Sequence, residues 1–417
     1  EFVLAVRLDD ARAKLWSDNL ASVLKVWTGL PIEKIPNGWQ LKKHLPPDLF
    51  RFVRVGNWVV IGLGQEKLPL TEQTVALISR HGAPAIAGND WLDAQVDWAR
   101  LARWFPALRG TDLPKINLHV AGSDGNLRLN GKIIFPRPPG FSLPPWQMPT
   151  NLIHEPFVSF TAARGTALWL EKLNWSQRLN IPPPNQFFLW ALPQIPFQTF
   201  APAPVSDAKA QLVQLDKKIN SGFGGGLRNP FLAPFTPQLT NNEITWRGLP
   251  YIAPFAQALR EPAGDFLFGG FFPNTPRGQP LPADLFRELS RNNLVYYHWE
   301  ITAQRLPEVL NLSQLGLLLT RHKQLAPQSA ALKWILQIAP KLGNTVTEIT
   351  QTAPDELTFT RKAPAGLTAA ELIALGNWLE ATNFPGCNLQ MPVARARPKN
   401  FRLLKRTTMP APAPAKK

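Results

Sequence analysis

Three aspartates spaced three and four residues apart are the first group in this sequence that could do chemistry. Asp90, Asp93 and Asp97 lie around Trp91 and Trp98. Carboxylates beside aromatic rings are typical of clefts that bind or cleave carbohydrates, where two acidic residues flank the glycosidic bond. More commonly, such aspartates cap helices and carry surface charge, here around Trp98. The sequence leaves both interpretations open.

A second polar group, Tyr296-Tyr-His-Trp-Glu300, ends a run that predicts a buried strand. Polar side chains at the end of a strand can form part of a functional site. A hydrogen-bonded network within the core is the more common arrangement. We therefore keep this run as a candidate site and expect a structural role for it.

Local signatures of metal, phosphate and nucleophile sites are absent from the sequence. The six histidines show no HxH or HExxH spacing, and the single cysteine, Cys387, has no histidine near it and excludes an intrachain disulfide. The run Gly222-Phe-Gly-Gly-Gly226 lacks the lysine of a phosphate-binding loop and does not connect a strand to a helix, so it predicts a flexible loop. We therefore expect no catalytic residue, no bound metal and no cofactor.

The periodicity of apolar residues predicts the elements that position these groups. Asp9 and Asp10 supply a helix cap, and Gly56-Asn57 suits the turn of a hairpin. The first block therefore comprises a strand at 2–8, a helix from 9 to 27, hairpin strands at 50–55 and 58–63, and a helix at 71–80.

The same order of elements returns in blocks that start near residues 157 and 294. The second block has a strand at 157–161, a helix at 166–173, strands at 186–191 and 197–200 and a helix at 206–219; the third has a strand at 294–300, a helix from 302, a hairpin at 346–360 and a helix at 368–379. Three diverged copies of one β-α-β-β-α unit would explain the recurrence, and chance recurrence is the alternative. The predicted fold class is α+β, with mainly antiparallel sheets and two or three such units.

Connecting modules lie between the blocks. Residues 116–120 and 127–135 predict a hairpin that turns at residues 123–125, and residues 255–260 predict a short helix. The glycine-rich run at 221–226 is the best candidate for a domain boundary. The predicted division is 1–140 for a first α+β unit with a hairpin extension, 150–225 for a second unit, 226–290 for a Gly/Pro-rich connector with short strands, 291–394 for a third unit and 395–417 for a basic Pro/Ala-rich tail.

Positive charge is concentrated at the C-terminal end. The formal charge is +16; residues 395–417 contain eight basic residues and no acid, and the remaining residues carry 37 basic and 29 acidic side chains. Such a tail is either a disordered solubilising segment or an arm that docks on an anionic surface, such as nucleic acid, lipid headgroups or an acidic protein. The residues expected to bind the partner are Arg395, Arg397, Lys399, Arg402, Lys405 and Arg406.

The aromatic content of the chain bears on how its core is packed. Fifteen Trp and twenty-four Phe against three Tyr predict an aromatic core.

Charges or prolines interrupt every apolar stretch before the roughly 18 residues that a membrane-spanning helix needs. The sequence begins at Glu1 and already predicts a strand there, from which we expect that a preceding signal or anchor was removed or omitted.

Three runs in the last third of the chain carry a family resemblance. Residues 292–306, 343–349 and 353–368 resemble an uncharacterised bacterial family of hypothetical, envelope-anchored proteins with no assigned activity. The resemblance implies an envelope location, on the periplasmic or extracellular side. It provides no catalytic residue to carry over.

We therefore predict a non-catalytic binding or scaffold protein of the bacterial envelope, a subunit of a larger assembly whose basic C-terminal arm contacts an acidic partner. The first alternative is a carbohydrate-active enzyme that uses the acidic residues from Asp90 to Asp97. A second alternative is a protein that binds nucleic acid or anionic lipid. Its nucleic-acid form is less favoured, because the aromatic residues lie in predicted strands and helices away from the basic tail.

Overall fold

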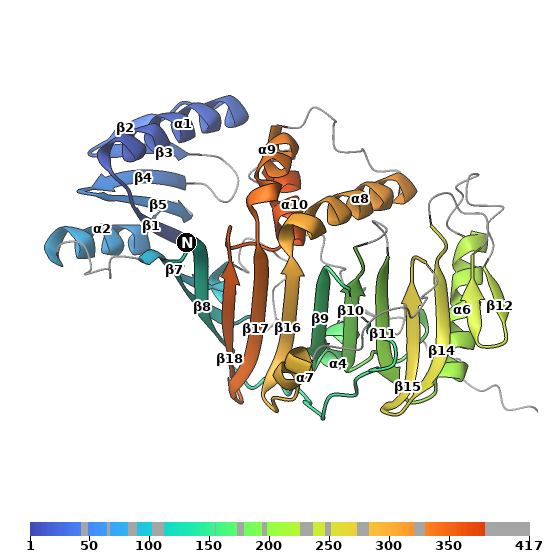
Figure 1. The fold of residues 1–417 in the computed structure, drawn as a ribbon. Helices are drawn as coiled ribbons and strands as arrows, with labels where there is room; N and C mark the ends of the chain where they lie inside the picture. Colours follow the sequence, from blue (N-terminus) through green and yellow to red (C-terminus); the bar gives the residue numbers. More distant parts are fainter. Residues whose placement is uncertain are drawn as a thin grey trace, which may run out of the picture.

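The protein has the predicted α+β fold, in which the paired strands are antiparallel. The computed structural model describes residues 1–42, 49–64, 67–81, 90–101, 112–154, 156–172, 179–193, 198–225, 237–246, 252–272, 283–320 and 330–379. These residues form a smaller and a much larger sheet, with helices packed on both (Figure 1). Within the described residues, no helix is long and apolar enough to cross a membrane.

The smaller sheet has five strands and a helix on each face. Its order is β1 (Phe2–Arg7), β5 (Trp58–Gly64), β4 (Leu49–Val55), β3 (Gly38–Lys42) and β2 (Glu33–Ile35). Helix α1 (Asp10–Thr28) packs on the face that contains Val59, and α2 (Pro69–His81) packs on the face that contains Val60. As predicted, Asp9 caps α1 by accepting a hydrogen bond from the Arg12 N–H.

The larger sheet has thirteen strands. Its order is β12 (Gln238–Thr240), β13 (Glu243–Thr245), β14 (Phe255–Glu261), β15 (Gly264–Gly270), β11 (Thr199–Val205), β10 (Gln186–Ala191), β9 (Ser159–Arg164), β16 (Leu294–Ile301), β17 (Asn344–Ala353), β18 (Glu356–Ala363), β8 (Asn126–Ile134), β7 (Lys115–Ser123) and β6 (Asp90–Asp97). Sequence-distant strands meet where β11 pairs with β15, β9 with β16 and β18 with β8.

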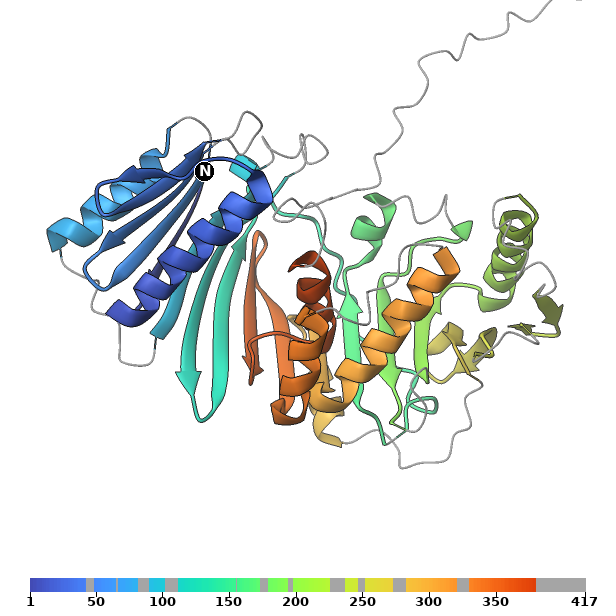
Figure 2. The same cartoon turned by 90° about the horizontal axis from the view of Figure 1, so that it is seen from above.

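The remaining helices are distributed along the larger sheet (Figure 2). They are α3 (Trp98–Leu101), α4 (Ala167–Lys172), α6 (Ala208–Gly225), α7 (Ala283–Leu289), α8 (Thr302–Thr320), α9 (Ala330–Ile338) and α10 (Ala369–Leu379), with a 3-10 turn at Ala339–Lys341. Helices α8, α9 and α10 share one apolar cluster, in which Leu306, Ile335 and Leu372 are buried. Strands β1 and β6, the adjacent edges of the two sheets, lie side by side.

The strand order shows how the predicted units are connected. In the second and third blocks, the first strand pairs with the strand that follows its helix, giving the groups β9-β10-β11 and β16-β17-β18. In the first block β1 instead pairs with β5, the last strand of that block. The hairpin β7-β8, predicted as an extension of the first unit, belongs to the larger sheet. The division into repeated units and domains stays a prediction.

Two local predictions are wrong. Residues 255–260 form strand β14 instead of a helix, because pairing with β13 and β15 and packing of both faces outweigh the helix preference of Ala, Leu and Arg. Phe255 and Ala258 are buried in different apolar clusters on the two faces. Helix α6 continues to Gly225, so the glycine-rich run expected to be a loop is helical up to that residue.

An aromatic core covers one face of the larger sheet around its centre. The rings of Trp190 and Phe268 stack with centroids 5.9 Å apart, and Phe200 lies 5.9 Å from Phe268. Phe160 and Phe266 are fully buried in the same cluster, which α7 helps to cover. The aromatic residues of this cluster are packing material, as the composition predicts.

We expect Phe266→Ala to lower the free energy of unfolding by about 3–5 kcal/mol, because it removes a buried ring and leaves a cavity in this cluster. Denaturant unfolding followed by circular dichroism measures the change. The matched control is Leu77→Ala on α2, whose side chain is 56% exposed and whose loss should change stability by at most about 0.5 kcal/mol. Equal losses in the two variants would contradict the assignment of Phe266 to the core.

Candidate functional site

The aspartates singled out in the sequence lie on β6, the edge strand of the larger sheet, and not on a helix. Because side chains alternate along a strand, Asp93, Gln95 and Asp97 share one face. A register shift between Asp90 and Leu92 marks a β-bulge around Trp91. The bulge allows Asp90 and Asp93, three residues apart, to approach the same side chain.

That side chain is His119 on the neighbouring strand β7. Its Nδ1 lies 2.8 Å from Asp93 Oδ1, and its Nε2 lies 3.1 Å from Asp90 Oδ1. The hydrogen bond to Asp93 raises the pKa of His119 above its ordinary value, and the negative charges of Asp93 and Asp90 act in the same direction while burial opposes them. The two carboxylates therefore hold one imidazole in a fixed orientation.

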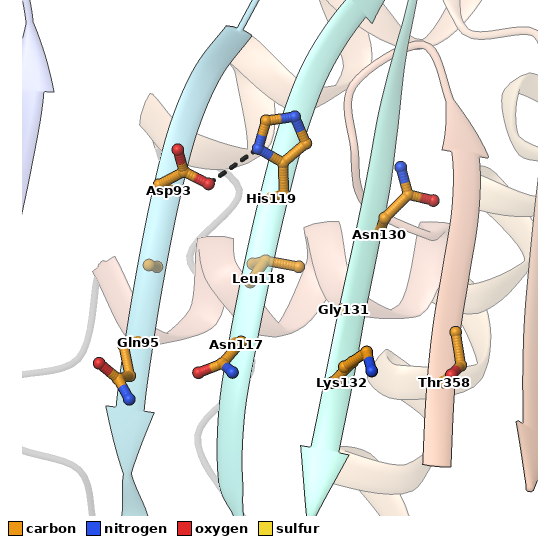
Figure 3. A pocket seen from close by; sticks show the side chains of 10 residues that line it. Asp93, Gln95, Asn117, Leu118, His119, Asn130, Gly131, Lys132 and Thr358 are labelled. Carbon is orange, nitrogen blue, oxygen red and sulfur yellow. Dashed lines mark hydrogen bonds and ion pairs between the residues drawn. The ribbon is translucent and has the colours of Figure 1, made fainter. Parts of the chain in front are cut away.

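A shallow groove with a volume of about 600 Å³ extends from this pair across β6, β7, β8 and β18. Strand register places Asp93, His119 and Asn130 in one row and Gln95, Asn117 and Lys132 in the next (Figure 3). The second row continues from Lys132 to Thr358 on β18. We name this surface the polar groove, and its polar side chains are Asp93, Gln95, Asn117, His119, Asn130, Lys132 and Thr358.

The amides of the polar groove are available to a ligand. The side chains of Gln95, Asn117 and Asn130 have no hydrogen-bond partner within the described residues, and Asn117 and Asn130 are exposed. Each amide offers both donors and acceptors. The groove can therefore form many hydrogen bonds with a polar partner without first breaking internal ones.

The other acidic and aromatic residues of this region, such as Asp97 and Trp91, do not line the polar groove. Asp97 is 3.4 Å from Arg100 Nε and accepts a hydrogen bond from the Arg100 N–H, so it caps the short helix α3. The side chain of Trp91 is 63% exposed and lies against Gly122. The groove itself is lined by polar and aliphatic residues. Asp93 is the one acid among the residues that line the polar groove, and no Phe, Tyr or Trp ring is among them.

The second sequence candidate, at the end of β16, is a structural network. The buried carboxylate of Glu300 accepts hydrogen bonds from Thr302 Oγ1 at 2.9 Å and from the Ala369 N–H at 2.7 Å. It therefore neutralises the N-terminus of α10. His298 Nδ1 lies 2.8 Å from Thr161 Oγ1 on β9, and its Nε2 lies 3.2 Å from Glu300 Oε2.

A second acidic residue completes the start of α10. The Glu371 N–H donates to Thr368 Oγ1 while Glu371 Oε2 accepts from the Thr368 N–H, which is a capping box. Arg361 binds the same carboxylate through both terminal nitrogens. Burial would raise the pKa of Glu371, but the hydrogen bonds from Arg361 and Thr368 outweigh it and hold the pKa below its usual value. Both acids at this helix start therefore have structural partners.

Arg164 is a buried cation that the sequence reasoning missed. It is 2% exposed and donates hydrogen bonds to the carbonyl oxygens of Leu294, Pro144, Arg291 and Asn292. Burial lowers its pKa. Four backbone acceptors satisfy the guanidinium without a carboxylate, so Arg164 ties the turn before β16 to β9. No local sequence signal marks such a role.

Several residues singled out in the sequence lie outside the described residues. In the part of the chain that the structure describes, no group of three His, Cys, Asp or Glu side chains could hold a metal ion. Gly226 and Cys387 lie outside the described residues. The expected partner-binding residues Arg395, Arg397, Lys399, Arg402, Lys405 and Arg406 lie outside them too.

Comparison with known proteins does not assign a family. No family model matches the chain, and no curated protein matches it. A solved structure described as crystal form I of TP0453 is similar over 55% of this chain and 99% of its own, with 9% sequence identity and a TM-score of 0.27.

We expect the pKa of His119 to exceed that of a free histidine and to fall in Asp93→Asn, because the substitution removes the main negative charge beside Nδ1. NMR titration of the ring protons measures both values. Because the folded-state pKa is raised, the stabilisation is complete below the unfolded pKa and is lost as pH rises through the folded one. Asp124→Asn, on the β7–β8 turn, is the control; a shift of His119 equal to that in Asp93→Asn would contradict the assignment.

We expect Glu300→Ala to lower the free energy of unfolding by about 2 kcal/mol, because it removes the acceptor of the Ala369 N–H at the α10 N-terminus and one of the two partners of the buried Thr302 hydroxyl. Denaturant unfolding measures this loss. Glu72→Ala, whose carboxylate is 67% exposed in a surface ion pair with Arg51, should change stability by less than about 1 kcal/mol. A Glu300→Ala protein as stable as Glu72→Ala would refute the network.

Proposed function

We propose that this chain is a non-catalytic binding protein, a scaffold subunit of a larger assembly, that recognises its partner with the polar groove. The observation that carries the proposal is that the charged side chains buried within the described residues, Arg164, Glu300, Arg305 and Glu308, are committed to structural contacts. Arg164 binds carbonyls, Glu300 caps α10, Arg305 pairs with Glu308 at 2.7 Å, and Arg361 pairs with Glu371. General acid–base catalysis instead needs an ionisable group free to exchange a proton with substrate.

The polar groove supports recognition of a polar partner. Its unpaired amides provide donors and acceptors in two adjacent rows. The charges of Lys132 and Asp93 in these rows are each paired, with Glu356 and His119. His119 is held between two carboxylates, so its ring already has a fixed orientation before a partner binds. Binding at this point therefore costs little side-chain entropy of His119. Hydrogen bonds from these rows would select the partner, and the spacing of the strands would set where along the groove the partner's groups lie.

The basic arm adds attraction for an acidic partner in this proposal. Residues 395–417 carry eight positive charges and no negative one. Attraction between these positive charges and an acidic partner speeds association, and it weakens as added salt screens it. The six residues from Arg395 to Arg406 named above would make these contacts. An envelope location belongs to the same proposal and is motivated by the family resemblance of the last third of the chain.

The carbohydrate-active alternative has less support. Asp90 and Asp93 both engage His119, and Asp97 engages Arg100, so each carboxylate already has a cationic or hydrogen-bonding partner. A glycosidase needs two carboxyl groups that face the sugar from opposite sides. The groove residues would suit binding of a hydroxyl-rich ligand better than its hydrolysis.

The proposal is tested by copurification of the full chain from its native source. We expect a stoichiometric companion that is retained by the wild type and lost by the triple variant Gln95→Ala, Asn117→Ala, Asn130→Ala, because that variant removes the unpaired amides. Deletion of residues 395–417 should weaken capture and reduce its salt sensitivity.

The control for the triple variant is Gln73→Ala with Gln214→Ala, which removes exposed amides from α2 and α6. Equal retention of the companion by the triple variant and this control would remove the groove from the proposal. Turnover of a glycan by the wild type that disappears in Asp93→Asn would replace the binding function with an enzymatic one.

A further inference from the structure

Helix α1 exposes large apolar side chains on the side opposite to its core contacts. Ala13 and Leu24 are buried against the smaller sheet. Leu15 and Val26 are 58% and 78% exposed. Eleven residues separate them, which is about three helical turns, so both project from the same side of α1, with the small residue Ser22 between them. A helix that only covered its sheet would carry polar residues at these two positions.

Helix α9 also exposes large apolar side chains. Ile335 is buried in the cluster shared with α8 and α10, while its neighbours Trp334 and Leu336 are 52% and 43% exposed. On α10, Trp378 is 36% exposed. Tryptophan has an apolar body and a polar N–H, and it is enriched where proteins meet the headgroup layer of a membrane.

Helices α1 and α9 lie on one side of the molecule (Figures 1 and 2). Helices α1 and α9 project from the same end in Figure 1, and viewed from above in Figure 2 they lie with α10 in front of the sheets. We name the exposed surface of α1 and α9 the helical face; its large apolar side chains are Leu15, Trp16, Val26, Trp334 and Leu336. It comes from elements other than those that form the polar groove.

Positive charges accompany the apolar residues of the helical face. Lys14 and Lys25 on α1 and Lys333 on α9 are exposed and have no ion pair within the described residues. The acids at the start of α1 are already compensated, because Asp9 pairs with Arg12 and Asp10 with Arg54. Long lysine side chains can extend past apolar surface and place their ammonium groups among phosphates. Asp18 is the exposed acid on α1 that opposes this attraction.

We propose that the helical face binds the surface of an anionic lipid bilayer, with Leu15, Val26, Trp334 and Leu336 in the headgroup layer and the lysines on lipid phosphates. Peripheral binding fits helices that are too polar to span a membrane. The combination of apolar side chains with uncompensated cations favours anionic lipid over the apolar surface of another protein. This inference goes beyond the proposed function, because it requires neither the polar groove nor a protein companion.

The test is flotation of the full chain with vesicles of phosphatidylcholine, with and without phosphatidylglycerol. We expect binding to the anionic vesicles that weakens with salt. Leu15→Ser with Val26→Ser should weaken it by about tenfold or more, and Trp334→Ala with Leu336→Ala by a similar factor, because each pair removes two large apolar contacts with lipid. Circular dichroism confirms that each variant is folded.

The matched control is Leu77→Ser on α2, which removes an equally exposed leucine from the opposite face of the smaller sheet and should leave flotation unchanged. A chain without residues 395–417 should still bind the anionic vesicles. Three results would overturn the inference: no flotation of the wild type, unchanged flotation of both helical-face variants, or equal weakening by Leu77→Ser. Because vesicles replace the companion in this experiment, its failure leaves the polar groove untouched.

Discussion

The antiparallel pairing of β9 with β16 is the contact on which the larger sheet depends. It joins strands more than a hundred residues apart, through register pairs such as Phe160 with Trp299. Closing so long a loop costs conformational entropy before any contact rewards it. Contacts on both faces of the β9–β16 pair offset this entropy cost. Phe160 lies in the aromatic core on one face, and the Thr161–His298 hydrogen bond lies on the other. Arg164 adds three hydrogen bonds to the turn that starts β16.

Elements specified by their own residues were predictable from the sequence. The β7–β8 hairpin is an example, because Asp124 and Gly125 both have positive φ, as its tight turn requires. Residues 255–261 show the limit, because Ala and Leu favour a helix and only the neighbouring strands make this segment a strand. The short strands β2, β3 and β12 carry too few residues for a periodic pattern. Pairing of distant strands leaves no local trace at all.

The site was predictable only in part, for the same reason. The carboxylates at residues 90–97 were identified by type and spacing, but their partner His119 depends on the register of β6 with β7, and a one-residue bulge sets that register. The capping box at the start of α10 has a readable signal in Thr368-Ala-Ala-Glu371. The role of Glu300 at the same helix start has none, because 69 residues separate donor from acceptor.

The bulge at Trp91 also limits how far the sheet can grow. Strand β6 is the last of thirteen, and an exposed edge of a large sheet is a template for further strands from other molecules. A bulge interrupts the regular spacing of the free backbone groups, and the charged Asp93 and Asp97 make an added strand costly. Strand β1 lies beside this edge and obstructs it further. A straightened, uncharged β6 would thus favour edge-to-edge aggregation.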